Sequence, residues 1–124
     1  IVGGHALAYH GRPRFTKDLD VLVEPTPDNA TRVMKSLTLF GFGSVGLTTD
    51  DFSRPGQIIQ LGVPPNRIDL LTAIDGVTFE EAGAGRAHGR FGHQPVTYLG
   101  RAEFLRNKRA SGRPQDLADI DAIE

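Results

Sequence analysis

The sequence contains no cysteine, which excludes disulfide bonds and thiolate metal sites. This absence fits a reducing compartment, and we expect a cytoplasmic protein. No apolar run approaches the roughly 20 residues of a membrane-spanning helix, and no signal-peptide pattern is visible, so no membrane partner is expected. The net charge is −1 at pH 7, so no overall basic field favours non-specific binding to nucleic acid.

The 124 residues give room for one domain with a modest core. A hydrophobic content of 39% and a charged content of 23% are ordinary for a globular protein. No repeat or low-complexity segment interrupts the chain. We therefore expect a single domain over residues 1–124. Both ends are expected to be trimmed, because the chain begins without a methionine and stops inside a helical pattern.

Apolar spacing and turn residues predict an alternation of helices and strands. The expected helices cover residues 2–11, 26–41, 78–83, 101–110 and 114–123. The expected strands cover residues 18–24, 57–63, 67–73 and 96–99. A loop is expected over residues 43–55, a turn over 64–66, and a loop or irregular hairpin over 83–94. This order predicts an α+β fold, in which a small mixed sheet has helices packed on one face.

Acidic residues occupy two of the predicted strands. Asp18 and Asp20 are two apart on one strand, so their side chains leave the same face, with Cα atoms roughly 6.5–7 Å apart. Asp69 faces away from Ile68 and Leu70 on a later strand, and it would join the pair if the two strands were neighbours. Three converging carboxylates suit Mg²⁺, and two such ions can clamp a phosphoryl displacement. The alternative is that all three are solvated strand residues.

Glycine and basic residues precede the acidic pair. Gly3 and Gly4 stand near the start of a predicted helix, where backbone N–H groups can approach a phosphate. A turn or a close helix contact would need glycine equally often. The basic segment 12–17 either steers phosphates by charge or forms a solvated loop, and Arg14 is its best candidate for a phosphate ligand.

The last two predicted helices carry further charged candidates. Lys108 is expected either to hold a γ-phosphate or to complement the helix dipole. Arg113 is either a phosphate ligand or a partner of Asp116. Asp116 itself is expected to serve the start of the last helix, and Asp119 to belong to an ion pair.

Together these motifs resemble the nucleotidyltransferase superfamily of DNA polymerase beta type. That family has Gly-Gly or Gly-Ser near a helix start, then an Asp-x-Asp strand and a third acid on a later strand, which here are Gly3-Gly4, Asp18-Leu19-Asp20 and Asp69. The chain is more closely similar to small bacterial nucleotidyltransferases related to abortive-infection and toxin–antitoxin toxins. Their Arg-x-Thr-x-Asp-x-Asp run resembles residues 14–20, and their C-terminal Lys followed by Arg-x-x-Asp-x-x-Asp resembles Lys108 and residues 113–119.

The resemblance implies a minimal nucleotidyltransferase fold and a Mg²⁺-dependent enzyme. Such an enzyme transfers a nucleoside monophosphate from an NTP to an acceptor hydroxyl. Asp18 and Asp20 would bind two Mg²⁺ ions, and Asp69 would complete this catalytic metal site and help to deprotonate the hydroxyl. The residues expected to bind the nucleotide are Gly3, Gly4, Arg14, Thr16, Lys108 and Arg113.

The chain departs from the family pattern in two ways. Many members carry Ser where Gly4 stands, and many carry an acceptor-presenting helical domain for which this chain is too short. The expected acceptor is a tRNA end, a protein side chain or a small molecule, and RNA modification by a toxin is the first expectation. An antitoxin protein and a second copy of the chain are expected partners. The alternative is a non-catalytic nucleotide- or partner-binding module that retains the fold.

Overall fold

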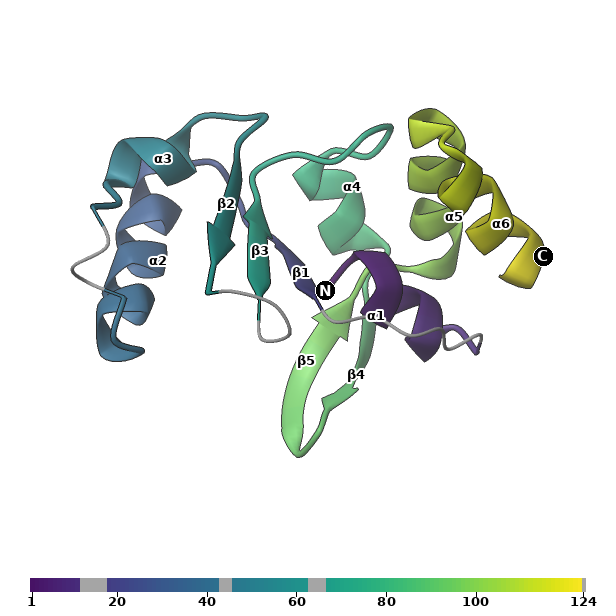
Figure 1. Cartoon of the computed structure of the whole chain (residues 1–124), viewed down its shortest axis with the longest axis horizontal. Helices are drawn as coiled ribbons and strands as arrows, with labels where there is room; N and C mark the ends of the chain where they lie inside the picture. Colours follow the sequence, from purple (N-terminus) through teal and green to yellow (C-terminus); the bar gives the residue numbers. More distant parts are fainter. Residues whose placement is uncertain (12–17, 43–45, 63–66, 124) are drawn as a thin grey trace.

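A computed structural model describes residues 1–11, 18–42, 46–62 and 67–123 of the chain. The described residues form a mixed α and β structure, shown in Figure 1, which confirms the predicted α+β class. The helices are α1 (Gly3–Tyr9), α2 (Pro27–Leu39), α3 (Thr49–Ser53), α4 (Phe79–Ala84), α5 (Arg101–Ser111) and α6 (Pro114–Ile123). The strands are β1 (Leu19–Leu22), β2 (Ile58–Leu61), β3 (Ile68–Leu71), β4 (Ala87–Phe91) and β5 (Gln94–Tyr98).

The central sheet has three strands in the order β1-β3-β2. β1 runs parallel to β3, and β2 runs antiparallel to it, so the predicted mixed sheet is confirmed. Helices α2 and α3 cover one face, where Leu37 and Phe52 pack with Leu70 of β3. On the other face, Leu22 and Leu71 pack against a second apolar cluster that includes α1 and α5. The expectation that helices pack on one face only was therefore wrong.

The second apolar cluster joins α1 to the β4–β5 hairpin and to α5. Leu7 of α1 and Phe104 of α5 are both fully buried in it. The rings of Tyr9 and Tyr98 stack with centroids 4.4 Å apart, and this contact fixes α1 on the hairpin. The rest of the hairpin projects away from the body of the molecule (Figure 1).

Capping residues explain where several helices begin. The Thr26 hydroxyl accepts a hydrogen bond from the backbone N–H of Asn29, and Pro27 opens α2, as predicted. Residues 43–55 were expected to form a loop, yet Thr48 and Asp51 form a capping box that starts α3. The burial of Phe52 then holds that short helix on the sheet.

Two other expectations concern connections between elements. Residues 83–94 were expected to form a loop or an irregular hairpin, but β4 and β5 pair in regular antiparallel register. The turn expected over 64–66 lies outside the described residues. Within the described part of the chain, no helix is long and apolar enough to cross a membrane.

Candidate functional site

Two carboxylates meet where β1 and β3 run side by side. The parallel register places Asp20 directly opposite Asp69, and Gln60 of β2 is the partner of Asp69 on its other side. Alternate residues of a strand share a face, and accordingly the neighbouring Val21 and Leu70 belong to the core cluster of α2 and α3. The condition under which Asp69 joins the acidic pair, that its strand lies beside the strand of Asp20, is therefore met.

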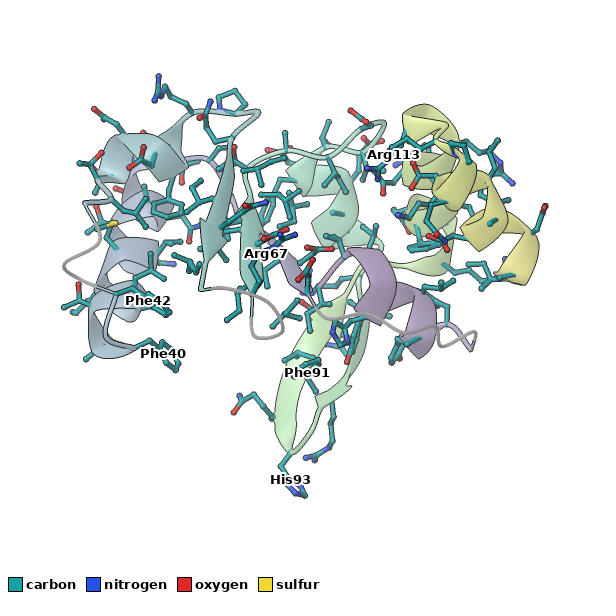
Figure 2. All side chains as sticks on the ribbon, viewed as in Figure 1. Phe40, Phe42, Arg67, Phe91, His93 and Arg113 are labelled. Carbon is teal, nitrogen blue, oxygen red and sulfur yellow. The ribbon has the colours of Figure 1, made fainter. Side chains whose placement is uncertain are left out.

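Arg67 connects Asp18 to the pair formed by Asp20 and Asp69. Its Nη2 atom lies 2.7 Å from Asp18 Oδ2 and donates a second hydrogen bond to Asp69 Oδ2 at 3.2 Å. Arg67 was not among the predicted site residues. The signal was present in the sequence, because Arg67 and Asp69 have the same two-residue spacing that grouped Asp18 with Asp20. Figure 2 labels Arg67 beside β1 and β3.

The contact between Arg67 and Asp69 leaves polar atoms unsatisfied. Arg67 Nε and Asp69 Oδ1 lie 3.0 Å apart as an ion pair, but neither of these buried atoms makes a hydrogen bond. A buried polar atom without a hydrogen bond costs free energy. Asp18 and Asp69 contact the Arg67 guanidinium, and Asp20 lies opposite Asp69, so these four side chains together carry a net charge of −2 (−3 + 1) when ionised.

The environment of Asp20 disfavours its ionised form. Burial, together with the negative charges of Asp69 and Asp18, raises the pKa of Asp20 to about 6. The positive charges of Lys108 and Arg67 oppose this increase but do not cancel it. A cation placed beside Asp20 would relieve both the repulsion and the loss of hydration.

Gly3 brings the backbone of the chain against this carboxylate. The N–H of Val2 donates a hydrogen bond to the carbonyl oxygen of Asp20 at 3.0 Å, and Gly3 follows with a φ of +65°. A β-carbon on Gly3 would overlap Asp20 Oδ2. Glycine is required here by both the positive φ and the close approach. Gly4, in contrast, is buried within α1.

A cavity of about 560 Å³ opens between the sheet and the C-terminal helices. Asp20, Asp69 and Gly3 line one side of it, and Lys108 and Arg113 line the other. The structure thus gathers five of the predicted site residues around one space. Asn107 and Ser111 of α5 also line it and were not predicted. Arg14 and Thr16 lie outside the described residues.

Lys108 is buried at the wall of the cavity and already has acidic partners. Its Nζ atom lies 3.2 Å from Asp116 Oδ1 and 3.7 Å from Asp119 Oδ2 of α6. Its side chain is 8% exposed, and those of Asp116 and Asp119 are 1% and 2% exposed, so all three charges are removed from water. The prediction that Asp119 belongs to an ion pair is confirmed.

Arg113 completes this charged group at the junction of α5 and α6 (Figure 2). Its Nε atom donates to Asp116 Oδ2 at 2.8 Å, and its backbone N–H donates to the same oxygen at 3.2 Å. Burial opposes ionisation of Asp116, but the hydrogen bonds from Arg113 and Lys108 outweigh it and lower its pKa. The hydrogen bond to Asp116 also raises the pKa of Arg113. Arg113 was expected to be either a phosphate ligand or a partner of Asp116, and in the structure it is a partner of Asp116.

The donors around Asp20 fit a hard divalent cation by their chemistry. No group of three or more His, Cys, Asp or Glu side chains is arranged to hold a metal among residues 1–11, 18–42, 46–62 and 67–123. Asp20 and Asp69 are adjacent, and Asp18 is joined to Asp69 through Arg67. Nevertheless, Mg²⁺ would fit the chemistry of this group, which offers carboxylate oxygens and a net negative charge. Asp69 Oδ1, which makes no hydrogen bond, could be one of its ligands.

The chain matches no protein-family model, and no curated protein matches it significantly. What the cavity can do therefore has to be argued from its residues.

Proposed function

We propose that the chain is a Mg²⁺-dependent nucleotidyltransferase that moves a nucleoside monophosphate from an NTP to an acceptor hydroxyl. The observation that carries this proposal is the adjacent pair Asp20 and Asp69, which lines a cavity whose backbone wall is Gly3. The motif order of the sequence, glycine pair, Asp-x-Asp strand and third acid, supports the same reaction.

The reaction transfers one nucleotidyl group. The acceptor oxygen forms a bond to the α-phosphorus, the bond from that phosphorus to the β-bridging oxygen breaks, and pyrophosphate leaves. The hydroxyl proton passes to a carboxylate, for which Asp69 is the proposed acceptor, and then to water. Mg²⁺ held by Asp18, Asp20 and Asp69 would supply charge neutralisation to the phosphates. The protein would contribute mainly positioning and fixed charge.

The far wall of the cavity is proposed to receive the triphosphate. Lys108 is close enough to Asp20 to lower its pKa, so its positive charge acts across the cavity. Asp116 and Asp119 hold its ammonium group in place. We propose that Lys108 faces the phosphates and that Arg113 lies beside them, while Arg14, Thr16 and Gly4 keep the nucleotide-binding roles implied by the resemblance.

The acceptor and the partners follow from the resemblance alone. We propose RNA, and first the end of a tRNA, as the acceptor of a toxin-like activity, with a protein side chain or a small molecule as the other classes. An antitoxin protein and a second copy of the chain remain proposed partners, in a cytoplasmic setting.

One observation favours a second candidate, a non-catalytic nucleotide- or partner-binding module. Arg67 already neutralises part of the charge of Asp18 and Asp69, and Lys108 has two carboxylate partners. Such internal ion pairs can stabilise the fold in a protein that binds no metal and catalyses no reaction. The raised pKa of Asp20 favours the enzyme, because an internal pair would have been expected to stabilise its charge.

The test is incubation of the purified protein with Mg²⁺, each α-³²P-labelled NTP and RNA, protein and small-molecule fractions of cells. We expect wild type to transfer label to one fraction and Asp20→Asn to transfer none. Asp50→Asn is the matched control, because it makes the same change on exposed α3, across the sheet from the cavity, and it should retain transfer. Absence of transfer by wild type, or equal transfer by Asp20→Asn, would sink the enzyme proposal.

A further inference from the structure

Arg67 is a cation of the chain itself that stands between two carboxylates of the candidate metal site. Its guanidinium contacts Asp18 Oδ2 and both oxygens of Asp69 within 3.2 Å. We propose that Arg67 is a built-in counter-ion that competes with a divalent cation for Asp18 and Asp69 and swings out when the cation binds. The inference rests on the proposed function for the existence of a metal site, and it adds a device that controls how the site is loaded.

The exposure of the three side chains allows this exchange. The side chain of Arg67 is 27% exposed, that of Asp18 is 31% exposed, and that of Asp69 is 12% exposed. Ion pairs that reach solvent contribute little to stability and can be replaced by other partners. The paired lysine on the far wall differs, because the side chains of Lys108 and Asp116 are at most 8% exposed. Arg67 can thus leave the carboxylates without crossing the core.

The geometry of the pair also favours exchange. Arg67 Nε and Asp69 Oδ1 are buried and 3.0 Å apart, yet neither makes a hydrogen bond. A guanidinium donates only in its own plane, whereas Mg²⁺ or Mn²⁺ accepts oxygen ligands around a full octahedron. A divalent ion can therefore bind the Asp69 oxygen that Arg67 contacts without a hydrogen bond.

The charge balance defines what Arg67 does in the metal-free protein. With Arg67 in place, the four side chains of Arg67, Asp18, Asp20 and Asp69 carry a net charge of −2 (−3 + 1). Withdrawal of Arg67 alone would leave −3, so it can leave only when another cation offsets the three carboxylates. Arg67 thereby limits the repulsion among the acids until a divalent ion takes its place.

The test measures Mn²⁺ binding without nucleotide, from the electron paramagnetic resonance signal of free Mn²⁺. We expect Arg67→Gln to bind Mn²⁺ about tenfold more tightly than wild type, because two partly exposed ion pairs no longer compete. Arg67→Lys keeps the charge and should stay within about threefold of wild type. Arg106→Gln is the matched control, because it removes an arginine from an exposed pair with Glu81 and should leave the affinity unchanged.

Each outcome bears on a different claim. The competition is supported if Arg67→Gln binds Mn²⁺ more tightly than wild type and the double variant Arg67→Gln with Asp18→Asn does not. Equal or weaker binding by Arg67→Gln, when wild type binds Mn²⁺ and Asp20→Asn does not, overturns the competition and leaves the proposed function intact. Binding by neither wild type nor Arg67→Gln removes the metal site, and both proposals fail together.

A second measurement needs no folded variant of Arg67. The side-chain Nε–H resonance of Arg67 in wild-type protein, read by ¹⁵N NMR, reports whether this group changes its surroundings. Addition of Mg²⁺ to wild type should shift that resonance toward the values of solvent-exposed arginines, while the Arg106 resonance stays in place. A resonance that does not move while Mg²⁺ binds would overturn the displacement.

Discussion

The backbone of Gly3 lies so close to the carboxylate of Asp20 that a β-carbon on Gly3 would overlap Oδ2. The contact joins the start of α1 to β1, and a backbone hydrogen bond from Val2 to the Asp20 carbonyl holds it in place. A ligand bound to the carboxylate of Asp20 in the cavity would therefore lie close to the peptide backbone at Gly3. This relationship makes Gly3 the most sensitive point of the site to a small substitution.

Gly3→Ala should destabilise the protein and disturb Asp20. The φ of +65° costs a non-glycine residue about 1–2 kcal/mol, and the overlap should add about 1–3 kcal/mol. Gly92→Ala is the matched control, because Gly92 has a φ of +62° with open space around it and should lose only the first amount. Urea unfolding measures both. Equal losses in the two variants would show that the contact with Asp20 has no energetic weight.

Asp20→Asn should stabilise the metal-free protein at neutral pH. Because the pKa of Asp20 is raised from 3.8 to about 6 on folding, the folded state binds the Asp20 proton more tightly than the unfolded state. Ionisation of Asp20 therefore lowers stability as the pH rises from about 4 to 6, and the penalty is complete above that. Asparagine does not ionise and so lacks this penalty. Compared with that of wild type, the free energy of unfolding of the variant should therefore be higher at pH 7 than at pH 4.

Urea unfolding in EDTA between pH 4 and pH 7.5 checks this prediction for Asp20. Asp50→Asn, at an exposed position of α3, is the control for the Asp-to-Asn change itself. A difference between Asp20→Asn and wild type that does not change with pH would mean that burial and the neighbouring acids do not raise the pKa of Asp20.

Local sequence signals were sufficient to predict much of the fold and the acidic residues of the site. Thr26, Pro27 and the apolar spacing that follows them predicted α2, because caps and helical periodicity act within a few residues. Strand alternation placed Asp18 and Asp20 on one face of their strand, and Asp69 on the face of its own strand opposite to Ile68 and Leu70. The short helix α3 was missed, although the Thr48 to Asp51 spacing is a capping signal, since five residues give too little periodicity to recognise.

The rest of the site depends on contacts that no local pattern contains. Arg67 meets Asp18 across 49 positions only because β1 and β3 pair in one particular register. Lys108 and Asp116 lie on different helices, and their contact depends on how α5 packs against α6. The sequence marked Lys108 as a phosphate ligand, but it could not reveal that two carboxylates would hold its charge.

The buried pair of Lys108 and Asp116 should be costly to break from one side. Asp116→Asn leaves the Lys108 ammonium with a weakened set of partners in a site where both side chains are at most 8% exposed, which should cost about 3–5 kcal/mol. Glu81→Gln is the control, because it breaks an exposed ion pair with Arg106 and should cost much less. The side chains of Glu81 and Arg106 are 47% and 49% exposed.

Combining Asp116→Asn with Lys108→Met in one protein separates the energy of the ion pair from the cost of burying an unpaired charge. Lys108→Met removes the ammonium that Asp116 serves, so adding Asp116→Asn to it should cost much less than Asp116→Asn costs alone. Arg113 limits this recovery, because it also donates to Asp116 and loses that partner in either background. Urea unfolding of the four proteins in the cycle gives the coupling. Costs that simply add would mean that Lys108 and Asp116 are neighbours without a shared energetic role.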